Sequence, residues 1–255
     1  MPGLLMIIVF LLAAIAYASV GFGGGSTYNA LLVLSGMDFR VIPLIALTCN
    51  ILVVSGGVYH FWRAGEFNIR ALLPFVALSI PMALVGGALP VSESLFSGLL
   101  GVSLLLAGAQ MLWKPAARPG RVSSLNPWLL GLPLGAATGV VAGITGIGGG
   151  IFLAPCLYLA GWAQPRKIAA MSSGFILVNS LAGMTGQLFK QQAQAPVTEW
   201  LNAWPLFIAV VLGGQIGSRL AAGKMPQLWI QRLTSLLILW VAVRLLRHWL
   251  VLLSA

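Results

Sequence analysis

The stretches Gly21-Phe-Gly-Gly-Gly25 and Gly146-Ile-Gly-Gly-Gly150 decide the fold of this chain. They align without a gap at an offset of 125 residues. Further landmarks follow in the same order in both halves: Asn50 with Asn179, Gly57 with Gly186, and Gly86-Gly87 with Gly213-Gly214. Several landmarks in one order indicate an internal repeat. We therefore expect the chain to consist of two copies of one structural unit.

Each glycine cluster lies inside an apolar run that is too long to be one membrane helix. The runs cover residues 3–36 and 128–161, and a straight helix of that length would measure about 51 Å. The apolar core of a bilayer is only about 30 Å thick. We expect each run to break at its glycines, because these lower helix propensity. A break at membrane depth must be buried in protein or line a cavity.

Composition places the chain in a membrane. Hydrophobic residues make up 59% of its 255 residues and charged residues 7%, against about 25% charged in a soluble domain. Long continuous apolar runs favour helices over a β-barrel. We expect an all-α, multi-pass protein of the cell membrane, the inner membrane of a bacterium. The formal charge of +10 comes from residues at the ends of apolar runs, so it indicates no nucleic-acid partner.

The repeat divides the chain into two transmembrane units, residues 1–117 and 127–255, joined by a polar linker at 118–126. Each unit should begin with a pair of helices separated by the glycine break. In order, the helices are expected near 3–20, 25–36, 41–62, 71–90, 94–113, 128–145, 150–161, 167–189, 201–221 and 227–250.

The number of crossings per unit decides how the two units are oriented. Five crossings make the repeats inverted, and four make them parallel. With the linker inside, inversion places every Lys and Arg on the inner side except Arg40, Lys190, Arg244 and Arg247. The parallel arrangement divides the basic residues almost evenly. Because basic residues concentrate on the cytoplasmic side of membrane proteins, the sequence favours inversion, and four crossings remain the alternative.

These motifs resemble those of a known family. The two glycine clusters, the helix around Gly213-Gly214 and the basic linker are similar to the TauE/SafE family of sulfite and organosulfonate exporters. The resemblance implies export of sulfite, a sulfonate or a related anion, and it makes the glycine clusters the signature elements of the family. A permease or channel for another small anion, such as a carboxylate or thiosulfate, is the alternative function.

Physical reasoning also favours an anion site at the breaks. A helix that restarts after a break has unpaired N–H groups and the positive end of its dipole there, and glycines let a ligand approach closely. Buried asparagines are costly unless they have partners. The predicted substrate-binding residues are Gly23, Gly24, Gly25, Ser26, Thr27, Asn50, Thr145, Gly148, Gly149, Gly150 and Asn179. The alternative roles are close helix packing for the glycines and interhelical hydrogen bonding for Asn50 and Asn179.

Acidic residues are placed where they would not repel an anion. Asp38, Glu66, Glu93 and Glu199 fall at expected loops or span ends. With no His, Asp or Glu at mid-span to activate a nucleophile, we expect a transporter and no enzyme, cofactor or metal site. The residues specify neither a coupling ion, nor the direction of transport, nor an oligomeric state.

Overall fold

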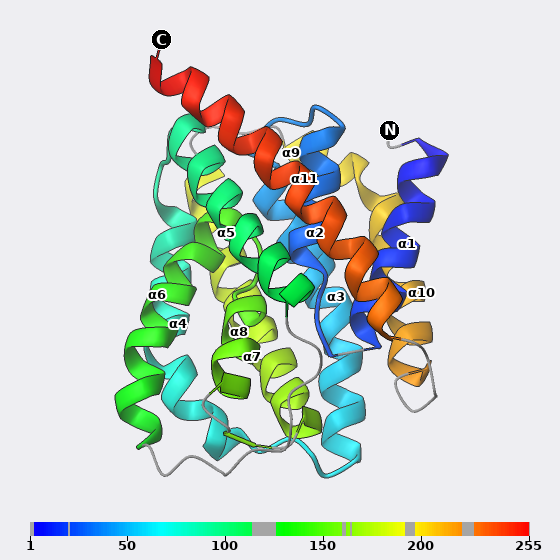
Figure 1. Cartoon of the computed structure of the whole chain (residues 1–255), viewed down its shortest axis with the longest axis vertical. Helices are drawn as coiled ribbons and strands as arrows, with labels where there is room; N and C mark the ends of the chain where they lie inside the picture. Colours follow the sequence, from blue (N-terminus) through cyan, green and yellow to red (C-terminus); the bar gives the residue numbers. More distant parts are fainter. Residues whose placement is uncertain are drawn as a thin grey trace.

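The computed structural model describes residues 3–19, 21–113, 126–159, 162–163, 165–191, 197–220 and 227–254, which form helices and no strand (Figure 1). The helices of the first half are α1 (Leu4–Ala18), α2 (Gly25–Leu34), α3 (Ile42–Arg63), α4 (Ile69–Ala88) and α5 (Glu93–Trp113). Those of the second half are α6 (Pro127–Thr145), α7 (Gly150–Leu159), α8 (Pro165–Gln191), α9 (Val197–Asn202), α10 (Trp204–Leu220) and α11 (Gln227–Ser254). Apart from Asn126, the expected linker lies outside the described residues.

The predicted helices match the observed ones to within about one helical turn, with one addition. The short helix α9 precedes α10 and was not expected. The two are separated at Ala203, whose carbonyl oxygen accepts hydrogen bonds from the N–H groups of Leu206 and Phe207. Pro205 has no N–H to donate, so it fits the first turn of a new helix and would interrupt the interior of a continuous one.

Within the described residues, four helical segments are long and apolar enough to cross a membrane. These are Ile42–Arg63, Ile69–Ala88, Pro127–Thr145 and Arg166–Lys190. Two shorter apolar segments, Leu4–Ala18 and Glu93–Leu106, accompany them. Large apolar side chains such as Leu106, Leu129 and Phe189 are exposed on the outside of the molecule, as expected for a surface that faces lipid. The chain is therefore an all-α, multi-pass membrane protein.

The helices of the two halves pack in an exchanged pattern. Helix α1 packs on α10, and its counterpart α6 packs on α4 (Figure 1). In the same way α3 packs on α10, and its counterpart α8 packs on α4. Two counterpart pairs also pack on each other, α3 on α8 and α5 on α11. The first helix of each half is thus packed on the helix of the other half that carries the matched glycine pair, Gly86-Gly87 in α4 or Gly213-Gly214 in α10.

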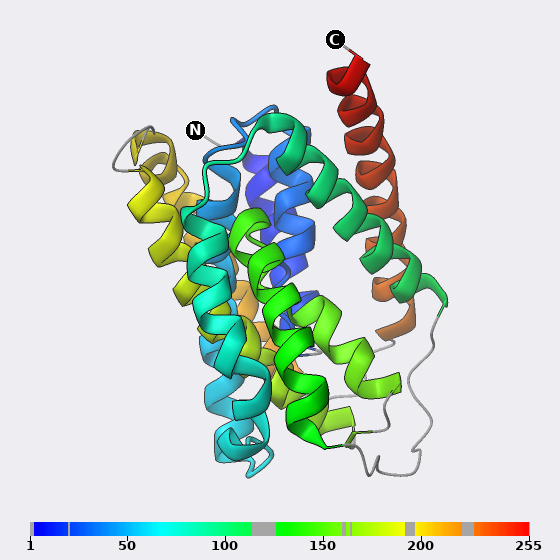
Figure 2. The ribbon, with the colours of Figure 1, turned by 90° about the vertical axis from the view of Figure 1, so that its left-hand side faces the viewer.

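Both pairs of counterpart helices run antiparallel. Along α3 and α8, Thr48 lies beside Met184, whereas Gly57 lies beside Ser173. Along α5 and α11, Gly98 contacts Trp249 and Gly101 contacts Leu246; Figure 2 shows these two helices side by side. In Figure 1, α1 starts at the upper end of the molecule and α6 starts at the lower end.

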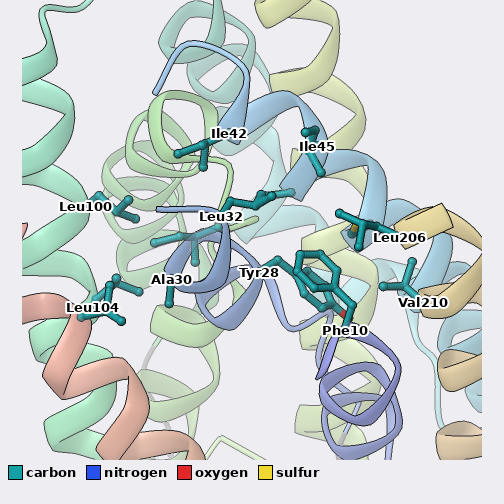
Figure 3. Close-up of a cluster of buried hydrophobic side chains, with 14 of the residues drawn as sticks. Phe10, Tyr28, Ala30, Leu32, Ile42, Ile45, Leu100, Leu104, Leu206 and Val210 are labelled. Carbon is teal, nitrogen blue, oxygen red and sulfur yellow. The ribbon is translucent and has the colours of Figure 1, made fainter. Parts of the chain in front are cut away.

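The short helix α2 is buried in the protein. It folds back beside α1, where the Tyr28 ring stacks on Phe10 with centroids 4.9 Å apart. Figure 3 shows Leu32 of α2 among side chains from α3 and α5, with Leu206 and Val210 of α10 close by. All residues from Gly25 to Ala30 are buried. In the second half, every residue from Ala142 to Gly150 is buried. Both breaks therefore lie inside protein, as the sequence predicted.

A row of glycines brings α6 unusually close to α4. Gly131, Gly135, Gly139 and Gly143 repeat at every fourth position, so they share one face of α6. A methyl group added at Gly135 would overlap the carbonyl oxygen of Phe75, and one added at Gly143 would overlap that of Ala83. A methyl group added at Gly139 would lie 2.5 Å from the carbonyl oxygen of Ser79. Without a hydrophobic force between helices in lipid, such close backbone contact is a main source of association.

We expect Gly139→Leu to destabilise the protein, because the added side chain would separate α6 from α4. Overpacking costs typically 1–3 kcal/mol, which corresponds to a fall of several degrees in melting temperature for a chain of this size. Thermal unfolding in detergent, followed by size-exclusion chromatography, measures the change. Gly3→Leu is the matched control, since nothing lies within 4 Å of a side chain added at Gly3. Equal melting temperatures of the two variants would contradict the prediction.

Candidate anion site at the helix breaks

The two glycine breaks meet between α3 and α8. A methyl group added at Gly23 would lie 2.5 Å from Asn50 Oδ1 and 3.3 Å from Ile176 Cγ2. One added at Gly148 would lie 3.0 Å from Asn50 Nδ2 and 2.9 Å from the same Ile176 carbon. Glycines from opposite halves of the chain therefore face the same two side chains, Asn50 of α3 and Ile176 of α8.

Both short helices start at this meeting point. Gly24 is the N-cap of α2, with φ of 85°, and no side chain caps the helix. The first hydrogen bonds of α2 are donated by Thr27 and Tyr28 to Gly24 O, and within the described residues the N–H groups of Gly25 and Ser26 have no acceptor. Helix α7 begins at Gly150 in the same manner, with Phe152 and Leu153 donating to Gly149 O. Two buried helix starts thus present unpaired N–H groups and positive dipole ends.

Asn50 is the central side chain of the site. It is fully buried, and its Nδ2 donates to the carbonyl oxygen of Gly146 at 3.1 Å. No donor among the described residues reaches its Oδ1. A methyl group added at Gly25 would lie 2.5 Å from Asn50 Nδ2 and 2.8 Å from Ile147 O. Asn50 therefore contacts the glycine breaks of both halves. Its Oδ1 has no hydrogen-bond donor among the described residues.

The other predicted residues divide into those at the meeting point and those beside it. Gly25, Gly148 and Gly150 surround Asn50 and Ile176, whereas Gly24 faces the ring of Tyr28 and Gly149 faces Phe175. Ser26 and Thr27 are buried in the first turn of α2. Thr27 Oγ1 donates to Tyr17 OH at 2.8 Å, and Thr145 Oγ1 donates within its own helix to Val141 O at 2.7 Å.

Asn179 differs from its counterpart Asn50 because both the nitrogen and the oxygen of its amide have hydrogen-bond partners. Its Nδ2 donates to Phe175 O at 2.8 Å, and its Oδ1 accepts a hydrogen bond from Ser79 Oγ of α4. These contacts link α8 to α4. They match interhelical hydrogen bonding, the alternative role that the sequence analysis gave to Asn179. A direct contact of Asn179 with substrate stays a prediction.

Two residues at the site were missed by sequence reasoning. Ile176 supplies the methyl group that both breaks contact, and Ser180 Oγ would lie 3.1 Å from a methyl group added at Gly148. The hydroxyls of Ser180 and Ser172 are buried and have no partner among the described residues. Ser172, Ile176 and Ser180 are spaced by four residues, hence share a face of α8. That spacing was the available signal for Ser180; an isoleucine in an apolar helix gives none.

The described residues around the site carry no carboxylate. Asp38, Glu93 and Glu199 are exposed and Glu66 is half-buried, all near helix ends, as the sequence predicted. No cluster of His, Cys, Asp or Glu suited to a metal ion occurs in the described part of the chain. Among the described residues no carboxylate would therefore repel an anion at the meeting point, and the positive dipole ends of α2 and α7 there favour negative ligands.

Residues 6–245 match the family model described as sulfite exporter TauE/SafE. The chain belongs to the TauE/SafE family. It is 31% identical over 242 residues to a probable membrane transporter protein of Sinorhizobium fredii, covering 94% of this chain and 96% of that protein. A probable membrane transporter protein of Methanocaldococcus jannaschii is 26% identical over 199 residues, covering 72% of each. No solved structure matches. The family assignment from glycine motifs is confirmed, and this member is a membrane transporter.

The link between Ser79 and Asn179 predicts a measurable coupling in this TauE/SafE protein. Ser79→Ala leaves a buried amide oxygen without a donor, which costs about 1–3 kcal/mol. Asn179→Leu should lower stability by a similar amount, and the double variant should be less destabilised than the sum of the two. A double-mutant cycle of unfolding free energies in detergent measures this, with a coupling of about 0.6–1.7 kcal/mol expected for a membrane protein. Strict additivity would refute the link.

Proposed function

We propose that this protein exports sulfite or an organosulfonate, and that the anion binds where the two glycine breaks meet. The observation that carries the proposal is the burial of two helix starts around Asn50, α2 at Gly25 and α7 at Gly150. Membership of the sulfite exporter TauE/SafE family supports this class of substrate. Broken helices that meet between two repeats are a recurrent design of secondary transporters.

The chemistry of the site suits an oxyanion. Sulfite and sulfonates present several oxygens on one atom, so a single ligand can accept hydrogen bonds from both helix starts. Each start adds about half a positive charge, which acts strongly in a buried environment of low dielectric constant. Gly23, Gly25 and Gly148 leave backbone rather than side chain next to Asn50. The hydroxyl of Ser180 has no partner among the described residues, so it can donate a further hydrogen bond to the anion.

We further infer that residues 1–117 and 127–255 form inverted repeats. The antiparallel packing of α3 on α8 supports this arrangement, because counterpart helices that contact each other across a two-fold axis in the membrane plane must run in opposite directions. The reversal of direction from α1 to α2 supports counting them as separate passes. Rocking of the two units around the shared site would then expose it to each side of the membrane in turn.

Flux measurements in proteoliposomes test the proposed substrate. We expect purified protein to move labelled sulfite or a small sulfonate down an imposed gradient, faster than protein-free liposomes do. Thiosulfate and small carboxylates serve as competing anions in the same assay. Transport of a carboxylate without sulfite or sulfonate would contradict the substrate assignment, and no movement of any anion would contradict the transport function.

Gly23→Ala tests the position of the site. Its methyl group would lie 2.5 Å from Asn50 Oδ1, so it should displace the amide and fill the space for the anion. We expect the transport rate to fall about tenfold or more, since displacing packed groups costs typically 1–3 kcal/mol and 1.4 kcal/mol corresponds to a factor of ten. Gly57→Ala is the matched control, because its methyl group would make an ordinary 3.6 Å contact with Ser173 Oγ. Wild-type flux in Gly23→Ala would place the site elsewhere.

A further inference from the structure

The space assigned to the anion contains hydrogen-bond acceptors as well as donors. Asn50 Oδ1 lies 2.5 Å from a methyl group added at Gly23 and 2.9 Å from one added at Gly25, so it faces the first glycine break. Asn50 is fully buried, and no donor among the described residues reaches this oxygen. The carbonyl oxygen of Ile147 lies 2.8 Å from the same position at Gly25. Two oxygens that can only accept hydrogen bonds therefore border the start of α2.

The orientation of the Asn50 amide is fixed by its nitrogen. Nδ2 donates to Gly146 O at 3.1 Å, and Gly146 is the C-cap of α6, at the end of the helix where carbonyl groups lack partners within it. A reversed amide would place Oδ1 against that carbonyl oxygen, so that two acceptors would repel each other. The oxygen of Asn50 therefore stays directed at the break, and it offers no donor to an anion bound there.

An unpaired acceptor in this place discriminates between ligands. A buried polar atom without a partner is destabilising, and native proteins contain few of them. The oxygens of a fully deprotonated oxyanion would only add a repulsive contact with Asn50 Oδ1. An anion with an O–H or N–H group would instead donate to Asn50 Oδ1 and accept hydrogen bonds from the start of α2 with its other oxygens. Sites built to bond such a group discriminate strongly against ligands that lack it.

The charge of the site suits a singly charged ligand. The stretches 25–30 and 142–150 are buried and contain no charged residue. The positive charge within them comes from the starts of α2 and α7, about half a charge each. Their sum is about one positive charge, which offsets one negative charge of a ligand. A doubly charged ligand would keep one buried charge without compensation, which is costly in a low-dielectric interior.

We propose that the site selects a monoanion that carries its own hydrogen-bond donor, and that this donor binds Asn50 Oδ1. The inference rests on the proposed function and deepens it, since it names the protonation state of the substrate. Sulfite in water is a mixture of the doubly charged ion and hydrogen sulfite, whose O–H form has such a donor. The protein accordingly carries hydrogen sulfite and rejects the doubly charged ion. A sulfonate without an O–H or N–H group binds less well than one that has it.

Three anions of similar shape separate the effect of the donor from that of charge. Sulfamate and methanesulfonate are monoanions that differ in one group on sulfur, an amino group or a methyl group, whereas sulfate is a dianion. Each competes with labelled sulfite for flux into proteoliposomes of the full-length protein at one pH. We expect sulfamate to inhibit at a concentration about tenfold lower than the other two, because leaving Asn50 Oδ1 unpaired costs enough for a factor of that size. Equal potency of methanesulfonate would overturn the donor requirement, and equal potency of sulfate would overturn the preference for a single charge.

The pH dependence of sulfite flux provides a second measurement. Raising the pH through the second pKa of sulfite converts hydrogen sulfite into the doubly charged ion. We expect KM for total sulfite to rise in proportion to the loss of hydrogen sulfite, with kcat unchanged. The potency of sulfamate, whose charge is constant over this range, controls for titration of the protein itself. A KM for total sulfite that stays constant or falls as the pH rises would overturn the proposal.

Variants identify the oxygen involved. Asn50→Ala removes Oδ1, so the preference for sulfamate over methanesulfonate should largely disappear. Gln187→Ala is the matched control and should keep the preference. Gln187 Nε2 also donates to a carbonyl group near the end of α6, that of Gly143. However, Gln187 is not among the nearest neighbours of a methyl group added at Gly23 or Gly25. A preference retained in Asn50→Ala would overturn the role of Asn50. Should Asn50→Ala fail to fold, the competition and pH measurements on the wild-type protein decide.

The outcomes separate this inference from the proposed function. Sulfite flux in the wild-type protein without a preference for sulfamate leaves the exporter assignment standing and overturns the donor requirement. A lack of flux for every sulfur oxyanion contradicts the export function, and the inference falls with it. Sulfite flux with the expected preference, lost in Asn50→Ala and kept in Gln187→Ala, supports both.

Discussion

A helix that breaks inside a membrane protein must find partners for its freed backbone groups in the protein, in water or in a ligand, because lipid offers none. The rest of this structure depends on that constraint. Both long apolar runs break at glycines, and both breaks are surrounded by other helices so that lipid never reaches them. The carbonyl groups at the end of α6 accept hydrogen bonds from amides of α2, α3 and α8. By contrast, no acceptor among the described residues reaches the first N–H groups of α2. The centre of the molecule therefore offers hydrogen-bond donors, because the described residues supply partners for its helix-end carbonyl groups but not for the first N–H groups of α2.

Much of the fold could be predicted from the sequence because it depends on local properties. The length of an apolar run limits how far a helix can continue, and Gly21–Gly25 and Gly146–Gly150 mark where each run ends. Helix boundaries were accordingly close to the observed ones. The boundary between α9 and α10 was missed because it consists of the single apolar residue Ala203, which leaves no turn signal of its own in the sequence.

The composition of the site was only partly predictable because it depends on contacts between distant segments. Asn50 and Asn179 occupy matching positions in the repeat, and nothing in their local sequence separates them. The difference lies in Ser79 of α4, which engages Asn179 and has no equivalent next to Asn50. Ile176 belongs to the site because two glycines approach it, which no local pattern indicates. The row of glycines on α6 was visible in the sequence as a four-residue period, but its partner helix was not.

The exchanged packing makes each half of the chain depend on the other. Helix α1 lies on α10 rather than on α4, and α6 lies on α4 rather than on α10. The packing of α1 on α10 and of α6 on α4 is absent from either half alone, so each half depends on the other to bury these helix faces. At the matched asparagines the two halves differ: no donor among the described residues reaches Asn50 Oδ1, whereas Asn179 Oδ1 accepts a hydrogen bond from Ser79.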